Sequence, residues 1–184
     1  MLRYAEEVML KRCNIGRSAR NKVLYTPRAM IKMTDGEDIC SSCGRSASIT
    51  DAACLVGHVS CLKVAHERGC PWDERTCACA AGGGHLPCLA YAHERGCPWD
   101  ERTCSYAARC GQLPCLAYAH EHGCPWDEDT CCEAAATGQL RCLVYAHERE
   151  CPWDEMTCVA AAQRGQLTCL DYAHERGCPW DART

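Results

Sequence analysis

Residues 111–121 read Gly-Gln-Leu-Pro-Cys-Leu-Ala-Tyr-Ala-His-Glu, and residues 84–94 repeat this text with one letter changed. The tetrapeptide Cys-Pro-Trp-Asp follows soon after each copy, and it begins at five positions that are always 27 residues apart: Cys70, Cys97, Cys124, Cys151 and Cys178. A fixed period of this size indicates one supersecondary unit stacked on copies of itself. The sequence therefore predicts a solenoid or a related array, in which function lies on a long repeated surface.

One unit, from Asp100 to Trp126, predicts two helices. Asp100 is placed to cap a first helix over 101–110, and Gly111 supplies a C-terminal stop. Pro114 opens a second helix, where its missing N–H does no harm, and this helix runs to about residue 122. Small inward residues on the first helix (Cys104, Ala107, Ala108) allow close packing. On the second helix the inward positions are Leu113, Cys115, Leu116, Tyr118 and Ala119.

The tryptophan of each Cys-Pro-Trp-Asp tetrapeptide is predicted to hold neighbouring units together. Pro125 prevents the second helix from continuing, so that Trp126 can fold back over the gap between units. An indole fully buried over ~150–250 Å² would contribute at most about 4–6 kcal/mol. The predicted structural residues are Trp72, Trp99, Trp126, Trp153 and Trp180.

The register divides the chain into a leader, residues 1–45, and an array, residues 46–184. The predicted helix pairs are 46–72, 73–99, 100–126, 127–153 and 154–180, and the first of these departs most from the repeat, as a capping unit would. Whether the chain is a whole protein or a segment of a longer array is left open.

Charge and hydropathy limit the function classes. The formal net charge is −4, and it divides into a basic leader and an acidic array, which carries nineteen Asp and Glu against eleven Lys and Arg. An acidic array argues against nucleic acid as a partner. No apolar run approaches the ~20 residues of a membrane span, and residues 1–20 do not form a secretory signal. We expect an intracellular monomer, cytoplasmic or nuclear, without contact to membranes.

The chain holds 21 cysteines, and fourteen of them fall at three fixed positions of the repeat. Equivalent residues of stacked helices lie ~10 Å apart, whereas a disulfide needs Cα atoms within about 7 Å. Equivalent cysteines are therefore expected to be reduced and to pack as small hydrophobic residues.

Residues 107–123, with paired alanines, Gly111 before Gln112-Leu113, and an apolar second helix that ends in Gly123, resemble the ankyrin repeat. The family's Thr-Pro-Leu-His opening is absent, and the period is 27 rather than 33. The missing residues fall where the family has a β-hairpin finger. The chain is thus similar to the short, cysteine-rich ankyrin-like arrays of large DNA viruses and of some protists and algae. The resemblance implies an all-α solenoid of stacked helix-turn-helix pairs with shortened or absent fingers, which serves as a protein-interaction scaffold.

Comparison of the units with one another separates a constant framework from a variable set. The variable positions lie mainly on the first helix, which lines the concave face in ankyrin-like stacks. Tyr and Arg dominate binding hot spots, and drift on a solvated face is the competing interpretation. The predicted partner-binding residues are Arg75, Arg102, Ser105, Tyr106, Arg109, Asp129, Glu133, Met156 and Gln163.

Two patterns could indicate zinc, whose usual ligands are Cys and His. One is the ladder His66, His93, His120, His147 and His174, but each unit offers too few ligands, and we interpret these residues as favourable charges at helix C-termini. The other is the pair Cys40 and Cys43, with Cys13 upstream and Cys54 downstream. No second C-x₂-C follows at zinc-ribbon spacing, so Cys40 and Cys43 are weak candidates, and no metal or other cofactor is predicted.

The sequence thus predicts a scaffold that binds an unidentified protein through its first-helix face. Two alternatives stay open: a zinc-binding or redox-responsive thiol protein, and a repeat segment of a larger ubiquitin-ligase-type adaptor. An enzyme is not expected, because no phosphate loop and no nucleophile–base pair is present.

Overall fold

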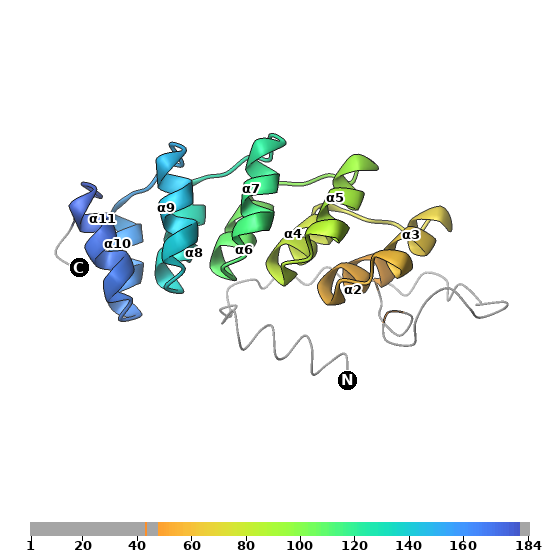
Figure 1. The fold of residues 1–184 in the computed structure, drawn as a ribbon, viewed down its shortest axis with the longest axis horizontal. Coiled ribbons are helices and arrows are strands. Elements are labelled where there is room, and N and C mark those ends of the chain that lie inside the picture. The colour runs from red at the N-terminus through yellow and green to blue at the C-terminus, as the bar shows by residue number, and fades with distance from the viewer. Residues whose placement is uncertain (1–42, 44–47, 181–184) are drawn as a thin grey trace, which may run out of the picture.

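The computed structural model describes residue 43 and residues 48–180, and it shows them as paired helices in one row (Figure 1). No strand occurs among these residues. The helices are α2 (Ile49–Val56), α3 (Val59–Glu67), α4 (Glu74–Gly83), α5 (Leu86–Glu94), α6 (Glu101–Arg109), α7 (Leu113–Glu121), α8 (Glu128–Ala136), α9 (Leu140–Glu148), α10 (Glu155–Gln163) and α11 (Leu167–Glu175).

The paired helices agree with the prediction, and in the unit from Asp100 to Trp126 the ends of α6 and α7 lie within one residue of the predicted ends. The predicted leader, residues 1–45, lies outside the described residues except for Cys43.

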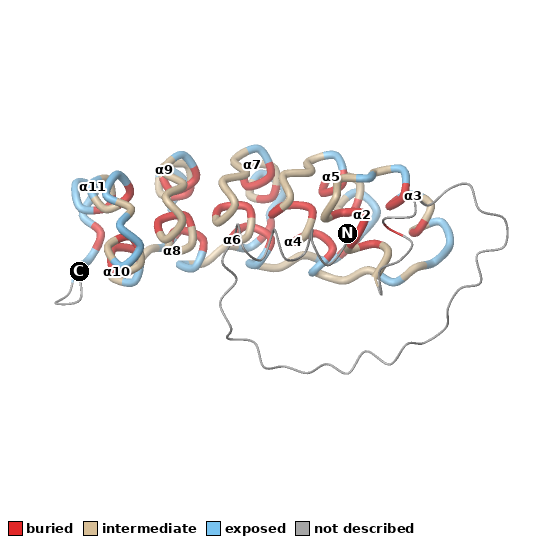
Figure 2. The backbone as a smooth tube through the Cα atoms, turned by 90° about the horizontal axis from the view of Figure 1, so that it is seen from below, coloured by how far each residue is buried: buried red, intermediate tan, exposed pale blue. Residues whose placement is uncertain are grey.

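The helices form two layers with the core between them (Figure 2). The first helices (α2, α4, α6, α8, α10) make one layer, and the second helices (α3, α5, α7, α9, α11) make the other. Neighbouring first helices pack against each other more extensively than neighbouring second helices do. Small residues explain this difference, because the buried faces of the first helices consist mainly of Ala, Cys and Thr.

The buried core is built from equivalent residues of successive units. The second helices supply a fully buried leucine in each of four units, Leu62, Leu89, Leu116 and Leu143. An alanine three residues later is also fully buried in each unit. The invariant leucine and alanine of the second helix thus lie at the centre of the stack in these four units.

Local chemistry sets the helix ends. The side chain of Asp100 accepts a hydrogen bond from the backbone N–H of Arg102, at 3.2 Å, and Asp73 and Asp154 cap α4 and α10 in the same way. Pro114 lies in the first turn of α7. The turns after the helices use glycines with positive φ, where a side chain would be strained. Glu150 takes this conformation without being glycine, with a φ of 64°.

In four units the cysteine of the Cys-Pro-Trp-Asp tetrapeptide joins the end of the unit to its beginning by a hydrogen bond. The thiol of Cys124 donates a hydrogen bond to the backbone carbonyl of Asp100 at 3.3 Å. The same bond joins Cys97 to Asp73, Cys151 to Asp127 and Cys178 to Asp154. These cysteines are thiols, as predicted, and no disulfide joins equivalent positions of the described units.

Candidate functional site

One exposed position of the first-helix layer carries a different type of residue in different units. It lies in the first turn of α4, α6, α8 and α10 and is occupied by Arg75, Arg102, Asp129 and Met156. All four residues are exposed, and Met156 keeps 40% of its surface. Gln163, the last residue of α10, is another exposed residue on the first-helix layer. The row that these residues form is called the first-helix surface below.

Arg102 is held by carboxylates of two units. Its guanidinium lies 2.6 Å from Asp100 and 3.5 Å from Glu74 of the preceding unit, while 47% of its side chain remains exposed. A pair this exposed contributes at most about 1 kcal/mol to stability. The carboxylates orient the arginine and leave much of its surface accessible.

Arg109 was predicted to bind a partner, but its side chain is largely enclosed. Only 11% of its side chain is exposed, and its guanidinium lies 3.3 Å from Glu133 on the neighbouring α8. The hydroxyl of Thr137 donates to the backbone carbonyl of Arg109 at 2.8 Å. Arg109 and Glu133 therefore form a contact between units.

Two further residues of the predicted set are also partly enclosed. Ser105 is only 6% exposed, and its hydroxyl donates to the carbonyl of Arg102 at 3.4 Å. Tyr106 is half-buried beside Gly82 of the preceding unit, where an added Cβ would lie 3.5 Å from the Cβ of the tyrosine. Ser105 thus offers little surface to a partner, whereas Tyr106 offers part of its ring.

An aromatic column, which the sequence analysis missed, runs along the edge where the Cys-Pro-Trp-Asp loops lie. In four units the histidine of the second helix stacks on the tryptophan of its own unit and meets the tyrosine of the next unit edge-on. His120, for example, lies 3.8 Å from Trp126 and 6.2 Å from Tyr145 between ring centroids. The other stacked pairs are His66–Trp72, His93–Trp99 and His147–Trp153.

The signal for this column was present in the constant spacing. The histidine stands six residues before the tryptophan and 25 residues before the next tyrosine in each of these four units. The histidines do lie in the last turns of their helices, but their rings contact aromatic partners. At the last unit Trp180 meets His174 edge-on and keeps 46% of its surface exposed.

Burial lowers the pKa of three column histidines, His93, His120 and His147, below the ordinary value. For His120 the desolvation of the ring is the main cause, and the cation of Arg149 adds to it. His147 is affected in the same way by burial and by Arg176. In His93 burial acts together with His122. The lowered pKa favours the neutral form of His93, His120 and His147.

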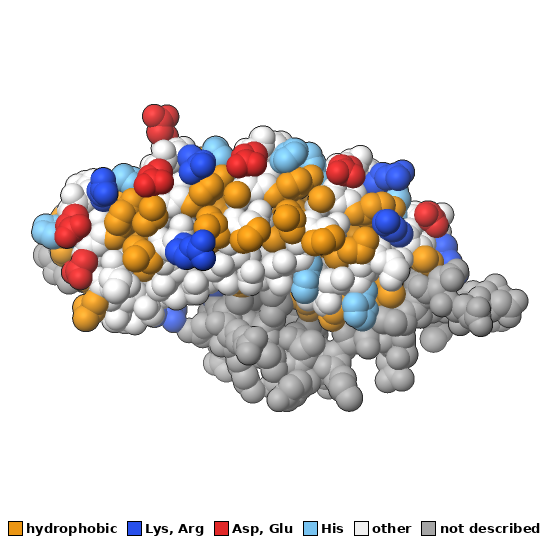
Figure 3. All heavy atoms as spheres, viewed as in Figure 1, with side chains coloured by type: hydrophobic (Ala, Val, Ile, Leu, Met, Phe, Trp, Pro, Cys, Tyr) orange, Lys and Arg blue, Asp and Glu red, His pale blue; other side chains and the backbone are white. Residues whose placement is uncertain are grey.

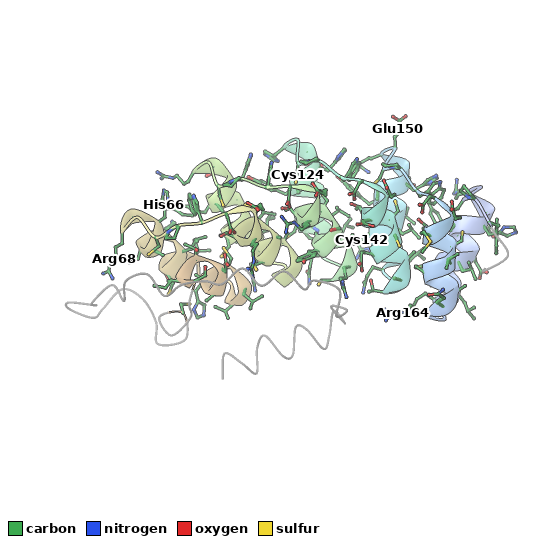
Figure 4. All side chains as sticks on the ribbon, turned by 180° about the vertical axis from the view of Figure 1, so that it is seen from behind. His66, Arg68, Cys124, Cys142, Glu150 and Arg164 are labelled. Atoms are coloured by element: carbon green, nitrogen blue, oxygen red, sulfur yellow. The ribbon has the colours of Figure 1, made fainter. Side chains whose placement is uncertain are left out.

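The repeated thiols are poorly suited to redox chemistry. Burial raises the pKa of Cys115 and of Cys142 to about 11. The pKa of Cys104 is raised by its hydrogen bond with Cys124 and then by burial. A thiol reacts as the thiolate, so thiols whose pKa is raised by burial are inert near neutral pH. In Figure 4 the labelled Cys124 and Cys142 lie among the helices.

The weak metal candidates are only partly described. Cys40 lies outside the described residues, whereas Cys43 is buried at the end of the array where α2 and α3 lie. Cys54 is buried in α2 and interacts with Cys88 of α5. Cys43 instead clusters with His58 and Cys61, two residues that the sequence did not suggest as ligands.

The second-helix layer presents a band of hydrophobic side chains, with charged side chains along the edge above it (Figure 3). A hollow on this side is lined by Leu113, Pro114, Leu140 and Arg141, among others. Its lining includes one thiol, Cys142, and no carboxylate or imidazole. The hollow therefore lacks a side-chain acid–base pair.

The comparisons with known proteins identify the fold. No protein-family model and no curated protein sequence matches the chain. Among solved structures, the human ASB11 ankyrin repeat domain is similar, with a TM-score of 0.60 and 17% sequence identity, over 71% of this chain and 69% of that one. The chain therefore has the fold of an ankyrin-like repeat solenoid. None of the described helices is long and apolar enough to cross a membrane.

Two structures of the pentatricopeptide repeat protein PPR10 in complex with an 18-nt psaJ RNA element also match. Their TM-score is 0.39 at 17% identity, and the match covers 74% of this chain but only 25% of theirs. This likeness is too distant to bear on the fold or the function of the chain.

Proposed function

We propose that the chain is an intracellular scaffold whose array, residues 46–184, binds a partner protein through the first-helix surface. One observation carries this proposal. The invariant leucine and alanine of the second helix are buried in the stack in four units, whereas the position held by Arg75, Arg102, Asp129 and Met156 varies and is exposed in each of these four units. A rigid framework that presents a changing row of side chains is suited to the recognition of an extended protein surface.

Packing supports the first-helix layer as the binding side, and charge supports a protein rather than a nucleic acid as the partner. An array bends toward the layer in which neighbours pack more closely, and here that is the first-helix layer. Repeat solenoids use such inner faces for binding. The acidic balance of the array, with nineteen acidic against eleven basic residues, disfavours a phosphate backbone. The raised pKa values of Cys115 and Cys142 support a structural rather than a redox role for these two thiols.

Position-specific cross-linking tests the proposed surface. A photoreactive amino acid is introduced at Asp129 or at Met156, which are exposed on the first-helix layer, and at Arg141 as the control. Arg141 is exposed on α9 in the opposite layer. We expect the same partner protein to be captured from positions 129 and 156 in cells, and not from position 141.

Substitution then shows whether the captured contact contributes to binding. We expect Asp129→Arg to weaken binding of the captured partner at least tenfold, because hot-spot residues contribute 2 kcal/mol or more. Helicity by circular dichroism should be unchanged, because Asp129 is exposed. Capture from Arg141 alone would instead place the interface on the apolar band of the second-helix layer.

A further inference from the structure

Three potential metal ligands converge at the first helix pair. Cys43, His58 and Cys61 each offer one ligand atom, and these atoms all lie within 4.8 Å of one another. The sulfur of Cys43 lies 3.5 Å from Nδ1 of His58. The two cysteines are buried, whereas the histidine is exposed. The sulfur atoms are thus shielded from water while one side of the cluster remains open.

The fold brings these residues together from two segments. His58 is the N-cap residue of α3, and Cys61 follows three residues later, so both side chains lie on one face of the first turn. Cys43 comes from the chain before α2 and approaches the same turn. The contact therefore joins the segment that precedes the array to the first helix pair.

The distances fit a tetrahedral zinc ion. Zinc binds sulfur at about 2.3 Å and histidine nitrogen at about 2.0–2.1 Å, which places sulfur and nitrogen about 3.6 Å apart at a tetrahedral angle. The sulfur of Cys43 and Nδ1 of His58 lie 3.5 Å apart. Two sulfur ligands would lie about 3.8 Å apart, within the 4.8 Å limit of the cluster.

The other units use the same positions differently. His85 is the residue equivalent to His58, and its Nε2 contacts the carbonyl oxygen of Leu55 in the preceding unit at 3.2 Å. Three later units place Gln at this position. The side chain thus normally contacts the preceding unit, and in the first unit it meets the thiol of Cys43 instead. The three-ligand cluster occurs once in the part of the chain that the structure describes.

We propose that Cys43, His58 and Cys61 bind one zinc ion that fastens the chain before the array to its first helix pair. Binding would release the two thiol protons to solvent and leave the imidazole neutral, as zinc coordination requires. A water molecule or a further group would complete the four ligands. The site lies at the first helix pair of the described array.

Metal binding to the whole chain tests this site. The protein is purified without chelator or added metal, and zinc is counted by native mass spectrometry. Cobalt is then titrated into the zinc-free protein, because thiolate–cobalt charge-transfer absorption reports sulfur ligands. We expect one zinc per chain and a cobalt spectrum that saturates at one equivalent. A wild-type chain that binds neither ion would overturn the proposal.

The chain offers closely matched control variants. His58→Gln introduces the residue that three other units carry at this position, so it should leave the helix pair folded, and His85→Gln is its control. Cys61→Ser has Cys169→Ser as its control, because Cys169 is the equivalent buried thiol of the last unit. We expect zinc affinity to fall at least tenfold in His58→Gln and Cys61→Ser and to be unchanged in the controls. Equal affinity in His58→Gln and His85→Gln would refute the site.

Discussion

His120 and Trp126 stack face to face, with ring centroids 3.8 Å apart and an angle of 12° between the ring planes. The same imidazole meets the ring of Tyr145 in the next unit edge-on, at 6.2 Å and 86°. One side chain therefore connects the loop of its own unit to the second helix of the following unit. Because a repeat array is stabilised by contacts between nearest neighbours, this column should contribute at each interface.

Trp126→Ala tests the contribution of the column to stability. Replacing a fully buried tryptophan by alanine typically costs about 3–5 kcal/mol. Since Trp126 is only half-buried, we expect the free energy of unfolding to fall by about 2–3 kcal/mol, including the loss of the stacked pair. Urea denaturation followed by circular dichroism measures this change.

Trp180→Ala is the control for this substitution. Trp180 is 46% exposed and meets its histidine edge-on rather than face to face. We expect its replacement to lower the free energy of unfolding by less than about 1 kcal/mol. Equal losses for the two variants would show that the stack on His120 adds nothing to stability.

The column should also make stability depend on pH. The pKa of each of His93, His120 and His147 is lowered in the folded chain. As the pH falls, the unfolded chain therefore binds protons before the folded chain does. The stability contributed by the neutral rings is present above the ordinary histidine pKa of about 6.5 and is lost as the pH falls below it, toward the lowered pKa values.

Urea midpoints measured between pH 7.5 and pH 5.5 check this dependence. We expect the midpoint to fall with the pH in the wild-type chain. A variant with Gln at positions 93, 120 and 147 should begin less stable but lose less over the same interval. An equally steep fall in both chains would assign the pH dependence to other groups.

The repeat framework was predictable because each unit carries its own helix start and stop signals. Asp100 at the helix start, Pro114 in the first turn and Gly111 at the stop are local signals, and they placed the helices to within one residue. The buried leucines followed from helical spacing. Five copies in one chain also showed which positions never vary, and the structure buries two of them, the leucine and the alanine of the second helix, in four units.

The candidate sites were less predictable because they depend on contacts between units. Arg109 is variable and charged, which suggested exposure, but Glu133 lies 3.3 Å away on the next helix and encloses it. His58 and Cys61 were assigned to the repeat pattern, so their closeness to Cys43 was not considered. Local spacing indicates which face of a helix a residue occupies but not which distant residue it meets there.

Glu150 lies at a position where the other units have glycine, and replacing it should stabilise the chain. Its backbone has a φ of 64°, and Figure 4 shows its side chain pointing away from the array. The left-handed conformation costs an L-residue roughly 1–2 kcal/mol. We expect Glu150→Gly to raise the free energy of unfolding by about 0.5–1 kcal/mol, after the greater chain entropy of glycine is subtracted.

Gly123→Ala is the converse change at the equivalent position of another unit. Gly123 has a φ of 81°, and nothing lies within 4 Å of an added Cβ, so the variant tests backbone strain alone. We expect a loss of about 1 kcal/mol. Thermal unfolding of both variants measures the two effects, and a Glu150→Gly chain that melts below the wild type would contradict the argument.

The buried thiols should react slowly in the folded chain. Burial raises the pKa of Cys115 and Cys142 to about 11, so only a small fraction of each is thiolate at pH 7.5. Both side chains are also almost inaccessible, with 1% exposure each. Inaccessibility and protonation act in the same direction, and each alone would slow attack on a thiol reagent.

Labelling followed by peptide mass spectrometry tests this expectation residue by residue. A small aromatic disulfide reagent is applied at pH 7.5 to the folded chain and to the chain in urea. We expect Cys115 and Cys142 to be labelled at least a hundredfold more slowly in the folded chain, at a rate set by local opening. Folded and unfolded rates that agree within a factor of a few would instead favour a redox-responsive protein, because the repeat would then expose its thiols to oxidants.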